Sequence, residues 1–272
     1  MALVRQEFVK VPRMSAERTP PIPLLQVRDA TKQYAGVMAV QNISFDLYPG
    51  EIVGLIGPNG AGKTTLINLI TGTAVPTRGT IHFEGMRLNG LKPHTISQKG
   101  IARTFQIVRP FENLTVLENV AVGAMFGAGG RKRSVREAFC KAETVLDFVQ
   151  LGGRQGDPAD SLTIAGRKRL ELAKALAMEP KLLLLDEVMA GLHGAEIDAA
   201  TDLIRAINQL GITILVVEHV MKVIMSVCQR LNVLDHGKKI AEGAPQEVTN
   251  NPAVIEAYLG KPRVRKVDQA QP

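Results

Sequence analysis

A glycine-rich stretch, GPNGAGKTT at Gly57–Thr65, constrains the fold of this chain more than any other feature. It matches the pattern G-x-x-x-x-G-K-[ST], which binds nucleotide phosphates when a strand precedes it and a helix follows. Both flanks meet that condition, because Ile52–Ile56 is a run of strand-forming residues and Lys63–Ile70 repeats apolar residues at helical spacing. We therefore predict a phosphate-binding loop here, and the alternative is a glycine-rich turn without a ligand.

The residue types in this loop explain how it would hold a polyphosphate. Gly60 and Gly62 let the backbone adopt conformations that larger residues disfavour and approach the phosphate oxygens. The backbone N–H groups then converge at a helix N-terminus, where the helix dipole also favours anions. We expect Lys63 to contact the β- and γ-phosphates and the Thr64 hydroxyl to coordinate Mg²⁺. The predicted nucleotide-binding residues of the loop are Gly57, Pro58, Asn59, Gly60, Ala61, Gly62, Lys63, Thr64 and Thr65.

Two further apolar strands lead into polar residues. Leu182–Asp186 ends in an acidic pair with Glu187, and Ile212–Val217 is followed closely by His219. Ligands bind at the carboxyl edge of parallel strands, so Asp186 is predicted to hold Mg²⁺ directly or through water. Glu187 is placed to polarise the water that attacks the γ-phosphate, and His219 to bind that phosphate or orient the water. The alternatives are a carboxylate pair that caps the next segment and a structural histidine.

Apolar strands that alternate with helices predict an α/β fold with a mainly parallel sheet covered on both faces. Amphipathic patterns predict helices over Ser134–Leu151, ended by Gly152–Gly153, and over Leu170–Met178 and Glu196–Leu210. Asp235–Gly237 separates two short apolar runs and predicts a hairpin.

The chain divides into three parts by composition. Residues 1–23 contain four prolines and no periodic apolar pattern, and we expect a flexible arm. Residues 24–260 form the predicted α/β domain, in which about 106–178 lack strong strand runs and are expected to be an inserted helical subdomain. Residues 261–272 are polar and basic and are expected to form a tail.

Bulk composition excludes several classes of protein. With 45% hydrophobic and 22% charged residues the chain resembles an ordinary globular protein, and no apolar run approaches the roughly 18 residues that span a bilayer. The net charge of +7 comes partly from basic clusters, but no aromatic stacking pattern accompanies them, so no nucleic-acid partner is expected. Cys140 and Cys228 are too few for a disulfide framework and are expected to be free thiols in a reducing cytosol.

Taken in order, these motifs resemble the ATP-binding cassette ATPases of ABC transporters, from GPNGAGKTT through RTFQ (Arg103–Gln106) and LLLLDE to VVEH. The resemblance covers nearly all of residues 24–260. It implies a P-loop NTPase core with a mainly parallel sheet, a small antiparallel β part and a helical subdomain, with ATP and Mg²⁺ as cofactors. It further implies that Gln106 touches Mg²⁺ or the attacking water and that Tyr34 stacks on adenine.

A narrower resemblance points to the branched-chain amino acid importer subgroup. It is carried by Gly100–Gly123, by MAGL after the acidic pair and by Ala241–Lys261. It implies an ATPase subunit at the cytoplasmic face of the inner membrane, working with a second ATPase subunit, two membrane permease subunits and, indirectly, a periplasmic binding protein. The coupling to the membrane is expected near Gln106–Phe126. The alternatives are a urea or amide importer, a lipopolysaccharide exporter and a soluble non-transport ABC protein.

Cassettes of this family dimerise head to tail, so that the signature of one chain, usually LSGGQ, closes the ATP site of the other. Leu162–Gly166 aligns with the signature but reads LTIAG. Thr163 keeps the hydroxyl that would meet the γ-phosphate, and it is also a competent helix N-cap. Ala165 and Ile164 replace both glycines and place a Cβ where the ATP would approach. Thr163 and Ala165 are the predicted contacts to the ATP of the partner chain.

Overall fold

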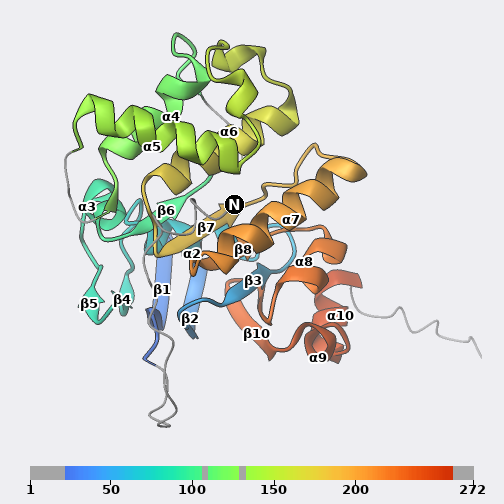
Figure 1. The fold of residues 1–272 in the computed structure, drawn as a ribbon. Helices are drawn as coiled ribbons and strands as arrows, with labels where there is room; N and C mark the ends of the chain where they lie inside the picture. The colour runs from blue at the N-terminus through green and yellow to red at the C-terminus, as the bar shows by residue number, and fades with distance from the viewer. Residues whose placement is uncertain (1–21, 106–109, 129–132, 260–272) are drawn as a thin grey trace, which may run out of the picture.

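The computed structural model describes residues 22–105, 110–128 and 133–259. The predictions made for residues 1–21, for the tail over residues 261–272 and for Gln106 lie outside the described residues. The domain is built around a six-stranded sheet with the strand order β10-β9-β3-β8-β7-β6 (Figure 1). Its strands are β3 (Ile52–Ile56), β6 (Ile101–Arg103), β7 (Leu182–Asp186), β8 (Thr213–Val217), β9 (Arg230–Asp235) and β10 (Lys238–Gly243).

This sheet is parallel except for its β10 edge, as the apolar strands predicted. β3, β7 and β8 are buried along their whole length. Successive side chains point to opposite faces, so Ile52 and Ile56 join the hydrophobic core on one side while Val53 and Leu55 join the core on the other. Both faces are covered, which explains why these strands carry no polar alternation. The hairpin predicted around Asp235–Gly237 joins β9 to β10.

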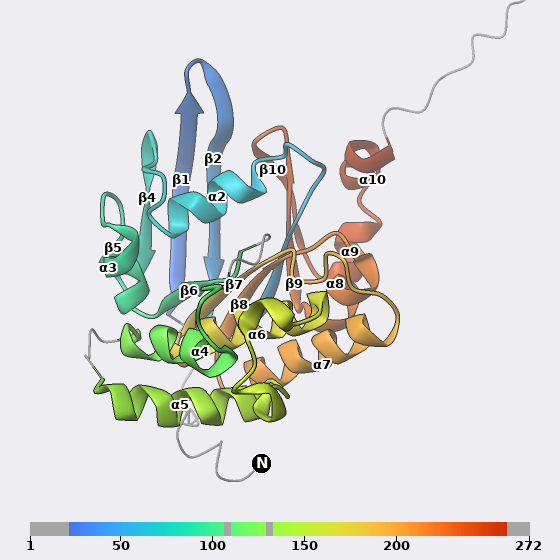
Figure 2. The same cartoon turned by 90° about the horizontal axis from the view of Figure 1, so that it is seen from above.

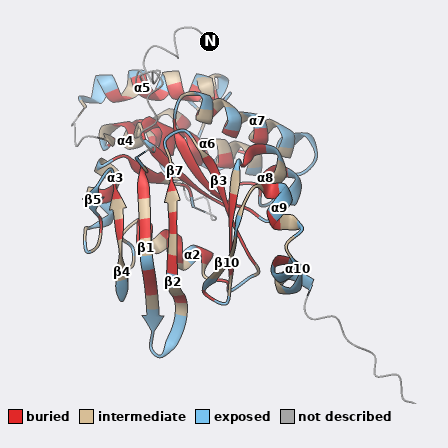
Figure 3. Ribbon diagram, turned by 90° about the horizontal axis from the view of Figure 1, so that it is seen from below, coloured by how far each residue is buried: buried red, intermediate tan, exposed pale blue. Residues whose placement is uncertain are grey.

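A second, antiparallel sheet has the order β2-β1-β4-β5. It packs with helix α2 on one side of the larger sheet, whereas α4 to α7 cover the other side (Figure 2). Buried segments concentrate where these layers meet (Figure 3). Its strands are β1 (Leu25–Tyr34), β2 (Val37–Leu47), β4 (Arg78–Phe83) and β5 (Met86–Arg87), and the helices of this side are α2 (Lys63–Ile70) and α3 (Pro93–Gln98).

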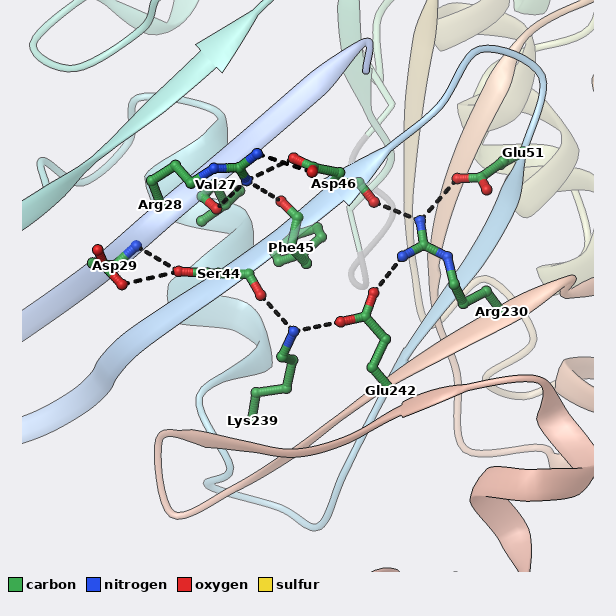
Figure 4. A network of polar contacts seen from close by, with 10 residues as sticks. All are labelled: Val27, Arg28, Asp29, Ser44, Phe45, Asp46, Glu51, Arg230, Lys239 and Glu242. Carbon is green, nitrogen blue, oxygen red and sulfur yellow. Dashed lines mark hydrogen bonds and ion pairs between the residues drawn. The ribbon is translucent and has the colours of Figure 1, made fainter. Parts of the chain in front are cut away.

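A polar network joins the antiparallel sheet to the edge of the parallel one (Figure 4). The guanidinium of Arg230, on β9, donates to the carbonyl oxygen of Asp46 at 2.6 Å and pairs with Glu51 at 3.0 Å and with Glu242. Lys239, on β10, donates to the carbonyl oxygen of Ser44 at 2.5 Å. Strands far apart in sequence are thus fixed side by side by charge-assisted hydrogen bonds, which are the stronger class.

Between β6 and β7 the described residues form helices and no strand of either sheet. Capping boxes at Thr115 with Glu118 and at Ser134 with Glu137 satisfy the first N–H groups of α4 and α5. Thr163 caps α6, because its hydroxyl accepts from the N–H of Gly166 at 3.2 Å. The helices of this side and the C-terminal ones are α4 (Val116–Met125), α5 (Val135–Phe148), α6 (Ile164–Ala177), α7 (Ala195–Gln209), α8 (Met221–Val227), α9 (Pro245–Thr249) and α10 (Pro252–Leu259).

Two helix boundaries differ from the predicted ones by more than one residue. The helix expected over Ser134–Leu151 ends at Phe148, and Gln150, with φ of 62°, takes the left-handed conformation that ends it. Gly152 and Gly153 do not stop that helix but begin a short 3-10 turn. The helix expected from Leu170 begins at Ile164, because the Thr163 cap supplies a start that the apolar periodicity did not reveal. None of the helices in the described ranges is long and apolar enough to cross a bilayer.

The residue Glu179, just after α6, forms ion pairs with α5 and with the segment that precedes α5, and these pairs make stability depend on pH. Glu179 pairs with Arg133 and, at 3.1 Å, with Lys141. Burial of this carboxyl group acts to raise its pKa, but the charges and hydrogen bonds of Lys141 and Arg133 outweigh burial and hold the pKa below its ordinary value of 4.5.

We expect Glu179→Gln to lower the free energy of unfolding at neutral pH by about 1 kcal/mol, a value reduced for the partial exposure of the carboxylate. Because the pKa of Glu179 is lower in the folded than in the unfolded protein, its ion pairs stabilise the fold fully at pH values above the unfolded-state pKa. This stabilisation is lost as the pH falls through the folded-state pKa. Chemical denaturation at pH 7 and at acid pH therefore gives a difference between wild type and variant that disappears on acidification. A difference that does not change with pH contradicts this assignment.

Candidate functional site

The glycine-rich loop joins β3 to α2 as predicted, and its glycines are required by packing as well as by conformation. Gly57, Gly60 and Gly62 have positive φ of 152°, 79° and 103°. A Cβ on Gly57 would lie 2.1 Å from the carbonyl oxygen of Leu234, and one on Gly62 would lie 2.6 Å from that of Ala39. Gly60 has nothing within 4 Å, so the loop is open at that point. Of the predicted loop residues, Asn59, Gly60 and Thr64 are exposed, and Pro58, Ala61, Thr65 and the others are buried or half-buried.

Lys63 lies inside the loop. Its side chain belongs to a residue only 6% exposed, and its ammonium donates to the carbonyl oxygens of Gly57 at 2.6 Å and Pro58 at 3.0 Å. Burial lowers the pKa of this ammonium, and the carboxylates of Glu187 and Asp186 oppose that shift. A buried cation beside backbone N–H groups at a helix start has the chemistry of an anion cradle, so the residues present fit a nucleotide phosphate.

Asp186 ends β7 at the carboxyl edge of the sheet and is 5% exposed. Its Oδ2 accepts a hydrogen bond from the Nη2 atom of Arg103 at 2.7 Å. The Nη1 atom of Arg103 donates to Oδ1 of Asn68 at 2.7 Å. Arg103 belongs to the RTFQ motif, but no role was predicted for it, and the signal that could have found it is a charged residue in an otherwise buried strand.

Glu187 and His219, each predicted to act on the γ-phosphate or the attacking water, are in contact. The Nε2 atom of His219 lies 2.9 Å from Oε1 of Glu187, and the backbone N–H of Glu187 donates to Val217 at 2.9 Å, which joins the ends of β7 and β8. The Glu187 backbone has φ of 52°, a conformation that costs free energy outside glycine and clusters at functional sites. The neighbouring Glu218 is buried and accepts from the N–H of Met189 at 2.8 Å, and burial raises its pKa.

The comparison with known proteins decides the family. The profile described as ABC transporter matches residues 40–190, more than half of the chain, and the profile described as branched-chain amino acid ATP-binding cassette transporter matches residues 238–266. The chain is 39% identical over 251 residues to the high-affinity branched-chain amino acid transport ATP-binding protein LivG of Escherichia coli K12, which covers 88% of this chain and 98% of LivG.

The chain belongs to the ABC transporter family. It is a cassette ATPase. Among solved structures it resembles the ADP conformation of MJ1267, an ATP-binding cassette of an ABC transporter, with a TM-score of 0.80 and 29% identity over 88% of this chain and all of that one. It also resembles the dimeric post-hydrolysis state of the cassette MJ0796 bound to ADP and Pi, with a TM-score of 0.73 and 26% identity over 81% of this chain and 98% of that one.

The predicted signature segment leads into the start of α6 and faces outward at its first residues. Thr163 and Ile164 are exposed, and Ala165 is half-buried. Lys168, further along the same helix, is 8% exposed and donates to the carbonyl oxygen of Glu187 at 3.2 Å. Lys168 therefore does not lie on a solvated face but joins α6 to the acidic residue that follows β7.

Tyr34 is the last residue of β1, at the tip of the hairpin to β2. It is 45% exposed, and the ammonium of Lys32 lies 4.8 Å from the centre of its ring. The adjoining strand β2 contacts the phosphate loop through Ala39, whose carbonyl oxygen faces Gly62. The ring is accessible for stacking, and its contact with adenine stays a prediction.

An apolar groove lies between the nucleotide site and the helices α4 and α6 of the cassette. Phe105, Phe111 and Phe126 line it and are 58%, 48% and 61% exposed, and Arg103 and Asp186 line it as well. Of the residues predicted for membrane coupling, Phe111 faces this groove, whereas Val116 is buried in the core. Leu114 and Leu117 are half-buried, and Ile107 and Val108 lie outside the described residues.

Proposed function

We propose that this cassette is the ATP-hydrolysing subunit of an importer of branched-chain or related amino acids, bound to the cytoplasmic face of the cell membrane. The observation that carries the substrate class is the identity of 39% with LivG over nearly the whole length of both chains. The chemistry is supported by the Glu187–His219 pair at 2.9 Å and by the buried ammonium of Lys63.

In this proposal the chain binds ATP with Mg²⁺ at the carboxyl edge of the sheet. Lys63 and the loop N–H groups bind the phosphates, and Tyr34 stacks on adenine. Thr64, Asp186 and Gln106 would hold Mg²⁺, which neutralises phosphate charge when bound. Glu187 accepts the proton of the attacking water, and His219, hydrogen-bonded to Glu187, orients Glu187 and the γ-phosphate.

A second cassette completes each ATP site. Thr163 and Ile164 are exposed at the start of α6, which supports a role in contacts to another chain. Thr163 and Ala165 then face the ATP held by the partner, while the partner's signature covers Lys63 and Glu187. The solved structure of the similar MJ0796 cassette with ADP and Pi is dimeric. Because Ile164 and Ala165 replace glycines, we propose that the site closed by this chain and the site that it holds differ in rate.

The groove is the proposed docking surface for the membrane permease subunits. Monomeric proteins rarely expose large contiguous apolar patches, and such patches mark interaction sites. Phe111 is held in place because the amide of buried Asn119 binds both its N–H, at 2.8 Å, and its carbonyl oxygen, at 3.1 Å. A fixed aromatic anchor in a groove is typical of the residues that carry interface energy.

We expect Phe111→Asp to reduce co-purification with the membrane subunits by roughly tenfold or more, since loss of one interface anchor costs about 2 kcal/mol. ATP binding by the isolated cassette should be unchanged, because the ring does not contact the loop. Val135→Asp is the matched control, since Val135 is 59% exposed on α5 and does not line the groove. Equal co-purification of both variants contradicts the docking proposal.

The whole proposal is tested by affinity purification of the tagged cassette from membranes, followed by uptake assays on a panel of substrates. We expect permease subunits, a second cassette and a periplasmic binding protein, with uptake of leucine, isoleucine or valine. Recovery with urea-uptake or lipopolysaccharide-export components instead would replace the substrate class. Recovery without any membrane protein would contradict transport altogether.

A further inference from the structure

The guanidinium of Arg103 bridges two elements of the nucleotide site. Arg103 ends β6 and its side chain is 13% exposed. One terminal nitrogen binds Asp186 on β7, and the other binds Asn68 on α2, both at 2.7 Å. No described residue accepts a hydrogen bond from its buried Nε atom, so these two contacts to different elements are the ones that orient the guanidinium.

The position of Asn68 on α2 shows which part of the nucleotide site this bridge can hold in place. Asn68 and Thr64 are four residues apart on α2, so they lie on the same face of the helix, one turn apart. Thr64, Arg103 and Asp186 also line the same groove. The bridge from Asn68 to Asp186 therefore sets how far the start of α2 lies from the end of β7, and these are the two elements that carry the proposed Mg²⁺ ligands.

We propose that Arg103 is a positioning residue that fixes the separation of Thr64 and Asp186 for Mg²⁺ and leaves Oδ1 of Asp186 free to face the metal. This inference rests on the proposed function, because it assumes MgATP at this site. An arginine suits the task because its planar fork binds two acceptors at once, whereas the compact ammonium of lysine cannot hold both in one fixed geometry. Its contact with the carboxylate is charge-assisted and strong.

Arg103 also faces the docking groove. The ring of Phe105 lies 5.2 Å from the guanidinium carbon, within the range of a cation–π contact. One side chain thus touches the proposed metal ligand, the helix of the phosphate loop and an aromatic residue of the groove. A partner that moves Phe105 would therefore act on the metal site through Arg103.

The test is calorimetric titration of the full cassette with ATP, once with Mg²⁺ and once with excess EDTA. Loss of a residue that orients a metal ligand typically costs 10- to 100-fold in metal affinity. We expect Arg103→Met to reduce the gain in ATP affinity that Mg²⁺ provides by about that factor, while Mg²⁺-free ATP binding stays within about twofold of wild type. Asn68→Ala should act in the same direction with a smaller effect, and Arg103→Lys should not restore the gain.

Arg133→Met is the matched control. The Arg133 side chain is 12% exposed and pairs with Glu179 outside the nucleotide site. It should lose stability through a broken, partly buried ion pair and keep the full effect of Mg²⁺.

Three outcomes would overturn the inference: an unchanged Mg²⁺ effect in folded Arg103→Met, an equal loss with and without Mg²⁺, or the same loss in Arg133→Met. Should Arg103→Met fail to fold, Asn68→Ala decides by the same criterion. Failure of the proposed function's MgATP site is distinguishable, because wild type then binds no ATP or gains no ATP affinity from Mg²⁺.

Discussion

Lys63→Ala is expected to abolish measurable ATP binding at the phosphate loop of this cassette. Truncating one partner of a buried, hydrogen-bonded charge pair costs about 2–5 kcal/mol, which lowers affinity by roughly 30-fold or more. Lys63 is 6% exposed and lies inside the loop, so no other cation within the loop takes its place. Isothermal titration of the purified chain with ATP measures the effect.

The control for Lys63→Ala is another buried lysine. Lys141 on α5 has a side chain that is 7% exposed and pairs with Glu179 outside the site. Lys141→Ala should lose stability yet bind ATP as wild type does at a temperature where the variant is folded. Undiminished ATP binding by Lys63→Ala would reject the phosphate-loop assignment.

Glu187→Gln is expected to stop hydrolysis at this site while leaving ATP bound. Glutamine keeps the shape of the side chain and a hydrogen bond to His219, but it cannot accept the proton of the attacking water. Removal of a positioned general base costs roughly 10²- to 10⁴-fold in rate. Single-turnover hydrolysis of labelled ATP by the assembled complex gives the rate, and Glu179→Gln serves as the same substitution outside the site.

The same variant tests whether the two sites of the complex differ. In the proposed dimer the divergent LTIAG would close the partner's site, whereas Glu187 would belong to the site that the partner closes. We therefore expect Glu187→Gln and the matching change in the partner to reduce ATPase activity by different amounts. Equal losses from the two variants would contradict the asymmetry.

The apolar strands of the parallel sheet that flank the phosphate loop and the acidic pair, and the loop itself, could be predicted because their signals are local. β3 and β7 have the predicted bounds, since a strand covered on both faces is apolar at every position and stands out in any sequence. Glu187 and His219 could be paired because parallel strands end at one edge. The boundaries that were missed depend on one residue each: the Thr163 cap that starts α6, and Gln150, whose left-handed conformation ends α5.

The contacts that the sequence did not predict join residues far apart along the chain. Arg103 with Asp186 and Lys168 with Glu187 are formed only when β6, β7 and α6 pack together. The local sequence does not reveal the partner of either cation, and burial of a charged side chain is decided by its partner. Lys168 shows this most clearly, because it is buried while its neighbours Arg167 and Arg169, in the same basic run, are half-buried.

ATP-driven uptake by the assembled complex in sealed vesicles tests the central claim most directly. The vesicles contain the permease subunits and both cassettes. The binding protein and labelled leucine are supplied on the side of the membrane opposite the cassettes. We expect uptake that requires ATP at the cassette side and falls at least tenfold with Glu187→Gln in this chain. Leucine uptake that continues at the wild-type rate with Glu187→Gln would contradict that claim. So would a wild-type complex that carries another substrate but takes up no leucine.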